Sequence, residues 1–195
     1  MSRTYAIESA KAWRQMSPVY LDTETTGLGP GDEVIEIAIV SDSGDAIFNS
    51  LVRPASAHIT NGAQAVHGIT EQMVAHAPSL ADLWPQICAA VQCHPVIIYN
   101  ASFDLAMLQR SLRANRIAED NIPFTNYCAM LLYAVFYGDW DYHRQSYRWW
   151  KLDAACRQCG IQQPQDHRAL GDAQLARLLV HHMAAQPETE DEYPF

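Results

Sequence analysis

The 195-residue chain contains no run of about 20 apolar residues, and its first residues lack the apolar segment of a signal peptide. Its five cysteines are an odd number, and their spacing shows no disulfide framework. Reduced thiols are typical of the cytoplasm, whereas small secreted domains often depend on disulfides. The sequence therefore predicts a cytoplasmic protein with no membrane contact, long enough to build one proper core.

Metal ligands of the zinc type are also scarce. Cys156 and Cys159 have ligand spacing but lack a second pair, and they lie in a stretch that is typical of a helix ending at Gly160. A zinc site is therefore not expected. Six histidines have no partner at metal-ligand spacing: His58, His76, His94, His143, His181 and His182. Most of these six are expected to be solvated.

Basic residues are few, with 13 Lys and Arg against 22 Asp and Glu and a net charge of −9. This balance argues against a nucleic-acid binder, because phosphate neutralisation normally dominates affinity. The distribution matters more, since residues 142–158 carry four basic side chains against one aspartate, interleaved with aromatic residues. Arg148 and Trp149 are candidate contacts to phosphates and unstacked bases. The alternative is that these aromatic side chains pack over the helices beneath them.

Two acidic residues end the first apolar strand, in the run Val-Tyr-Leu-Asp-Thr-Glu-Thr-Thr-Gly-Leu of residues 19–28. Asp22 and Glu24 are two positions apart, so on a strand their side chains face the same side. Adjacent anions repel unless a proton or cation lies between them, and their hard oxygen ligands suit Mg²⁺ or Mn²⁺. The alternative is a polar strand end that leads into a turn.

Further acids follow at two other element boundaries. Asp104 comes just after the apolar run 96–99, which is typical of a buried strand. Asp172 lies in a stretch whose leucines recur at helical spacing, and His167 precedes it by five residues, a little over one helical turn. The sequence thus predicts that a histidine and several carboxylates face one cleft.

These three motifs, complete and in order over residues 18–181, resemble those of the DnaQ-like 3′-5′ exonucleases, the DEDDh group of the DEDD superfamily. They are Asp-Thr-Glu-Thr-Thr-Gly-Leu at 22–28, Asn-Ala-Ser-Phe-Asp at 100–104 and His-Arg-Ala-Leu-Gly-Asp at 167–172. Position 168 is arginine and not the tyrosine of the sister DEDDy group, so the chain falls with the histidine branch. Val-His-Gly-Ile-Thr at 66–70 is also similar to a segment common in the family.

The resemblance implies two Mg²⁺ or Mn²⁺ ions, a metal pair suited to in-line attack of water on a phosphodiester. Asp22 would bridge the ions, Glu24 and Asp172 would complete the tighter site, and Asp104 would hold the second ion directly or through water. His167 would act as general base, since imidazoles titrate near neutral pH.

The resemblance also implies a pocket for the terminal nucleotide. Leu28 would wedge against the terminal base, Thr25 would approach the 3′ hydroxyl, and His67 and Phe103 would line the pocket. Core packing is the alternative for Leu28 and Phe103, and a structural role is the alternative for His67.

The expected fold is α/β, a mixed sheet flanked by helices, and the resemblance implies the RNase H-like architecture. Residues 1–187 would form one exonuclease domain that begins with a short helix, and residues 188–195 an acidic tail. Residues 58–76 are expected to be a polar connection with short turns. The expected strands are 18–23, 33–41, 45–52 and 95–99, and the expected helices are 6–16, 79–92, 103–115, 127–137, 151–159 and 168–185.

The resulting hypothesis is a metal-dependent 3′-5′ exonuclease that releases nucleoside 5′-monophosphates from single-stranded or frayed 3′ ends, with DNA favoured over RNA. One alternative is a 3′-5′ exoribonuclease of the oligoribonuclease or RNase T kind, which would share the five catalytic residues. Another is a non-catalytic module that binds nucleic acid or a polymerase. The sequence leaves open whether the protein acts alone, trims ends in DNA repair, or proofreads for a polymerase partner.

Overall fold

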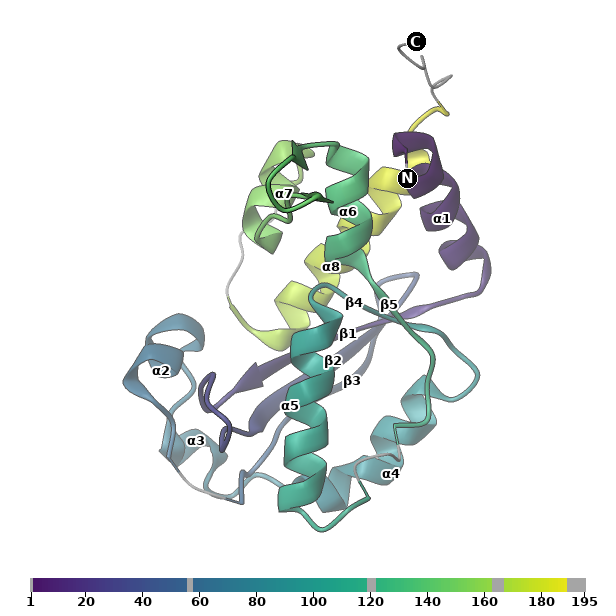
Figure 1. The fold of residues 1–195 in the computed structure, drawn as a ribbon. Coiled ribbons are helices and arrows are strands. Elements are labelled where there is room, and N and C mark those ends of the chain that lie inside the picture. The colour runs from purple at the N-terminus through teal and green to yellow at the C-terminus, as the bar shows by residue number, and fades with distance from the viewer. Residues whose placement is uncertain (1, 56–57, 119–121, 163–166, 189–195) are drawn as a thin grey trace.

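The computed structural model describes residues 2–55, 58–118, 122–162 and 167–188. Its centre is a five-stranded mixed sheet in the order β3-β2-β1-β4-β5 (Figure 1). The strands are β1 (Val19–Thr25), β2 (Val34–Ser41), β3 (Ala46–Leu51), β4 (Val96–Ile98) and β5 (Asn126–Cys128). The first three pair antiparallel, and β4 and β5 continue the sheet parallel to β1. The expected α/β class, with helices flanking a mixed sheet, is confirmed.

Helices cover both faces of this sheet (Figure 1). Alternation along β1 divides the core in two, because Tyr20 packs in the cluster beneath α1, α6, α7 and α8, whereas Val19 and Leu21 pack in the cluster beneath α4 and α5. The helix bounds are α1 (Arg3–Gln15), α2 (Asn61–His67), α3 (Glu71–Val74), α4 (Leu80–Val91), α5 (Ala101–Ala114), α6 (Ala129–Tyr137), α7 (Leu152–Gln158) and α8 (Ala169–Ala185).

Three short features differ from the sequence-based expectation. The expected helix 127–137 begins only at Ala129, because residues 126–128 pair with β4 as strand β5. A hairpin of β6 (Trp140–Asp141) and β7 (Ser146–Tyr147) follows, which was not expected. Within residues 58–76, α2 and α3 replace the expected turns, since the side chains of Thr60 and Thr70 cap these two helices.

None of the helices formed by the described residues has the length and apolar character that spanning a bilayer requires. The part of the expected acidic tail from residue 189 onward lies outside the described residues.

Candidate active site

Three carboxylates meet where β1 extends beyond the end of β4 while it still pairs with β2. Asp22 and Glu24 project from the face of β1 that α8 covers, and Asp172 lies in the first turn of α8. One carboxylate oxygen from each of the three lies within 4.8 Å of the others. The structure therefore brings together three of the four predicted ligands.

The fourth predicted ligand, Asp104, approaches from the opposite layer. It lies in the first turn of α5, and its Oδ1 accepts a hydrogen bond from Thr23 Oγ1 at 2.7 Å. Thr23 stands between Asp22 and Glu24 on β1 and so faces the α5 side of the sheet. This contact joins Asp104 to the strand that carries the other acids, although it does not place Asp104 within the group of three.

Burial and mutual repulsion disfavour the ionised form of three of these acids. Burial, followed by the charges of Asp172, Glu36 and Asp104, raises the pKa of Glu24 to about 8. Burial raises the pKa of Asp104 to about 7, and burial together with the neighbouring acids raises the pKa of Asp22 well above its usual range. A cluster of hard oxygen donors in this state suits divalent cations such as Mg²⁺ or Mn²⁺, which would replace the bound protons.

His167 lies directly before Arg168, the N-cap residue of α8; it is exposed and adopts a left-handed backbone conformation with φ +50°. The next residue, Arg168, forms an ion pair with Glu36 of β2, and Glu36 Oε2 also accepts a hydrogen bond from the Ala169 backbone N–H at 3.0 Å. These contacts fix the chain on the C-terminal side of His167, five residues before Asp172.

A cavity of about 410 Å³ adjoins the carboxylates, and Glu24 is part of its lining. All four residues predicted to hold the terminal nucleotide line this cavity: Thr25, Leu28, His67 and Phe103. Small residues of the α2 segment, Gly62 and Ala63, form part of its wall. Glu24 thus connects the acid cluster to a space on the scale of one nucleotide.

Leu28 is 81% exposed, so the alternative of core packing is wrong for this residue. Its loop is held by Asp32, whose carboxylate accepts hydrogen bonds from Thr26 Oγ1 at 2.7 Å and from the Gly29 N–H at 2.5 Å. Phe103, in contrast, is half-buried against the core while it also lines the cavity. An apolar side chain in a fixed loop is thus available at the cavity rim.

His67 is buried and has a clear structural role. Its Nδ1 accepts a hydrogen bond from the Ile69 N–H at 3.0 Å, so its Nε2 carries the hydrogen and donates to the Thr25 carbonyl at 3.2 Å. Burial lowers the pKa of His67, in keeping with the neutral ring. His67 therefore links α2 to the strand end that presents Thr25.

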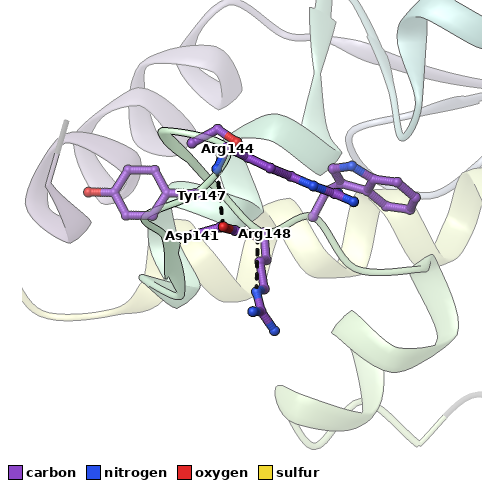
Figure 2. Close-up of a pocket in the computed structure, with 6 residues that line it drawn as sticks. Asp141, Arg144, Tyr147 and Arg148 are labelled. Atoms are coloured by element: carbon purple, nitrogen blue, oxygen red, sulfur yellow. Dashed lines mark hydrogen bonds and ion pairs between the residues drawn. The ribbon is translucent and has the colours of Figure 1, made fainter.

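Arg148 and Trp149 line a separate cavity of about 420 Å³ on the β6–β7 hairpin (Figure 2). Asp141 accepts a hydrogen bond from the Arg144 N–H and lies 3.7 Å from Arg148 Nε, and Asp139 lies 3.8 Å from the same nitrogen. The positive charge of Arg148 is thus partly offset by two aspartates just before residues 142–158. This cavity shares no lining residue with the nucleotide-sized one.

Sequence reasoning missed two residues near the acids. Glu36 of β2 binds Arg168 and the Ala169 N–H at the start of α8, and Thr23 of β1 donates a hydrogen bond to Asp104. A signal for Glu36 was present, because it is a single charged residue within the otherwise apolar run Val-Ile-Glu-Ile-Ala-Ile-Val at 34–40. A buried charge normally has a partner, and such a residue therefore calls for one elsewhere in the chain.

Fold and site together define an RNase H-like nuclease of the DEDDh type. The family model of the RNase T exonucleases matches residues 19–179, and the chain belongs to this exonuclease family. It is therefore a hydrolytic nuclease. It is 31% identical over 182 residues to the "uncharacterized exonuclease CP81" of Escherichia phage 186, a match that covers 91% of this chain and 93% of the phage protein.

A second relative is a polymerase-related protein. The "DNA polymerase III subunit epsilon-like protein" of Rhodobacter capsulatus is 36% identical over 163 residues, which are 79% of this chain. The match spans only 22% of that longer protein. The similarity therefore concerns only this part of the Rhodobacter protein.

Solved structures agree with this assignment. Exonuclease X in complex with 5′ overhanging duplex DNA superimposes with a TM-score of 0.61 and 30% identity, over 85% of this chain and 90% of that one. The nuclease domain of 3′hExo, a DEDDh family member bound to rAMP, superimposes with a TM-score of 0.67 over 90% of this chain and 95% of that domain. At 17% identity the latter supports the fold alone.

Proposed function

We propose that the protein is a divalent-metal-dependent 3′-5′ exonuclease that releases nucleoside 5′-monophosphates from DNA, preferring single-stranded or frayed 3′ ends. The observation that carries this proposal is the place of Glu24, which belongs both to the group of three carboxylates and to the lining of the adjacent cavity. A scissile phosphate at the acids would leave the cavity for the nucleotide on its 3′ side. The DNA-bound state of Exonuclease X, at 30% identity, supports DNA as the substrate.

Asp22, Glu24 and Asp172 would hold one divalent cation, and Asp104 would contribute to a second. When bound, such ions activate water and neutralise charge on the transferring phosphate. His167, which is exposed and lies five residues before Asp172, would accept a proton from the attacking water.

The residues around the cavity would bind and orient the end of the strand. Leu28 would pack against the terminal base from the rim and favour an end that is already unpaired. Thr25, held by His67 through its carbonyl, would lie near the 3′ hydroxyl. Phe103 would pack against the sugar or base from the α5 side, and tight binding of this end would orient the scissile bond.

The test is digestion of matched substrates with Mg²⁺, with Asp22→Asn as the control for contaminating nucleases. We expect a 5′-labelled single strand to give a descending ladder and a 3′-labelled one to release labelled mononucleotide at once. A 3′-phosphorylated strand and matched RNA should be degraded more slowly. Cleavage of circular single-stranded DNA would contradict an end-binding pocket, and faster digestion of RNA would favour the exoribonuclease alternative.

A further inference from the structure

A buried carboxylate on β2 supports the start of α8. Glu36 is 3% exposed and pairs with Glu24 across the β1–β2 ladder, so both side chains face the α8 side of the sheet. Its Oε2 accepts hydrogen bonds from Arg168 Nε and from the Ala169 N–H, each at 3.0 Å. Its Oε1 accepts from Arg168 Nη2. Both oxygens are thus engaged by α8 and its cap, which leaves Glu36 unsuited to act as a further metal ligand.

The contact replaces an ordinary helix cap. Arg168 occupies the N-cap position of α8 with an extended backbone, φ −125° and ψ 140°, and its side chain makes no capping hydrogen bond. The Ala169 N–H is one of the donors that a helix start leaves without an intrahelical acceptor. Glu36, 133 positions earlier in the chain, accepts this hydrogen bond in the way that a local Asp or Ser usually does.

The residue just before this cap is His167, whose φ of +50° is uncommon for a residue with a side chain. Such a backbone conformation is strained for a residue with a side chain, and it persists where the surroundings enforce it. The bidentate pair between Arg168 and Glu36 is the anchor next to it. Loss of this anchor would allow His167 to relax from this backbone conformation.

We propose that Glu36 and Arg168 form a positioning clamp that holds His167 in place for proton transfer; this inference rests on the proposed function. A purely electrostatic effect of this pair on the acid cluster is a weaker explanation, because the charge of Glu36 raises the pKa of Glu24 while that of Arg168 lowers it. These opposing effects partly cancel. The remaining explanation is positional, in which the clamp acts by holding His167.

A double-mutant cycle tests this path. Arg168→Lys keeps the charge but loses the two-pronged contact, and Glu36→Gln removes the anionic acceptor. We expect each to lower kcat about tenfold with little change in KM in the wild-type background, and less than about twofold in the His167→Ala background. Equal losses in both backgrounds, or a change confined to KM, would overturn the proposal.

Arg177→Lys is the matched control. Arg177 also anchors α8, through hydrogen bonds to the Asp42 and Ser43 carbonyls at 2.8 and 2.9 Å, but it lies ten positions beyond His167. We expect its kcat to equal that of the wild type. Melting temperature and Mn²⁺ affinity, measured for every variant, identify losses that arise from unfolding or from a damaged metal site.

A readout without turnover separates this inference from the proposed function. In protein with ¹³C-labelled histidine, the His167 resonance, assigned with His167→Ala, should shift in Arg168→Lys and stay in place in Arg177→Lys. An unmoved resonance in Arg168→Lys would refute the clamp. If the resonance shifts in Arg168→Lys but the wild-type protein digests no nucleic acid, the positioning of His167 by the clamp stands and the exonuclease proposal is refuted.

Discussion

Removing one negative charge from the acid cluster should stabilise the metal-free protein. In Asp172→Asn the side chain keeps its shape while one anion disappears within 4.8 Å of Asp22 and Glu24 oxygens. At that distance and an effective dielectric of about 20, two unit charges repel by about 3 kcal/mol. The opposing loss is the favourable interaction of Asp172 with the α8 N-terminus, about 0.3–1 kcal/mol.

Protonation of the remaining acids relieves part of this repulsion, so we expect a net gain of about 1–2 kcal/mol at pH 8. For a domain of this size that corresponds to a rise in Tm of roughly 2–8 °C. The pH dependence has a definite sign. Because the pKa of Glu24 is raised to about 8, the folded state holds a proton that the unfolded state has lost, and wild-type stability without metal falls as pH rises from about 5 to 8. The fall should be shallower in the variant.

The assay is thermal unfolding in excess chelator at pH 5 and pH 8, with Glu8→Gln on the exposed face of α1 as a charge-matched control. Saturating Mg²⁺ should reverse the order, because a ligand at 100 times its Kd stabilises the wild type by about 2.7 kcal/mol. A lower Tm for Asp172→Asn than for wild type in chelator at pH 8, with Glu8→Gln unchanged, would refute the repulsion argument.

Four further outcomes are expected. Asp22→Asn should lower the cleavage rate at least about a thousandfold while circular dichroism shows an intact fold, because a ligand is lost from a site dominated by electrostatic stabilisation. His167→Ala should slow single-turnover cleavage about a hundredfold and leave Mn²⁺ affinity unchanged, as expected for a general base that is not a metal ligand. Ca²⁺ should support DNA binding in a filter assay without efficient cleavage, because its coordination is looser than that of Mg²⁺. Arg148→Ala should weaken binding of single-stranded DNA and reduce the slope of log affinity against log salt concentration by less than about 1, since Asp139 and Asp141 offset its charge. Trp149→Ala should weaken this binding at every salt concentration.

The parts of the fold that the sequence predicted are those with long apolar patterns. The strand expected at 33–41 is Val34–Ser41, and the helix expected at 79–92 is Leu80–Val91 with a capping box at Ser79. Strand β5 was missed because its three residues are defined by hydrogen bonds to β4, which no local pattern records. The two-residue strands of the β6–β7 hairpin are likewise too short to show alternation.

The site shows the same division. The acids were found because each lies at an element boundary within a recognisable motif, whereas the Glu36–Arg168 pair joins residues 132 positions apart. His181 is an exception to the expectation that most of the remaining histidines are solvated, because its Nε2 lies 2.7 Å from Asp42 Oδ1, an oxygen that also accepts a hydrogen bond from Tyr20. Side-chain partners of this kind depend on packing between α8 and the β2–β3 turn.

Strand alternation explains why the acids gather at the end of β1. Within the sheet, neighbouring residues of a strand face opposite layers and cannot share a ligand. Where β1 emerges beyond its short partner β4, which pairs only as far as Leu21, the first turns of α8 and α5 can both approach it, one from each layer. Asp172 arrives beside Asp22 on one face, and Asp104 is tied to Thr23 on the other. The relative positions of the carboxylates therefore depend on how both helix layers pack, so a core substitution beneath either helix can change activity without touching an acid.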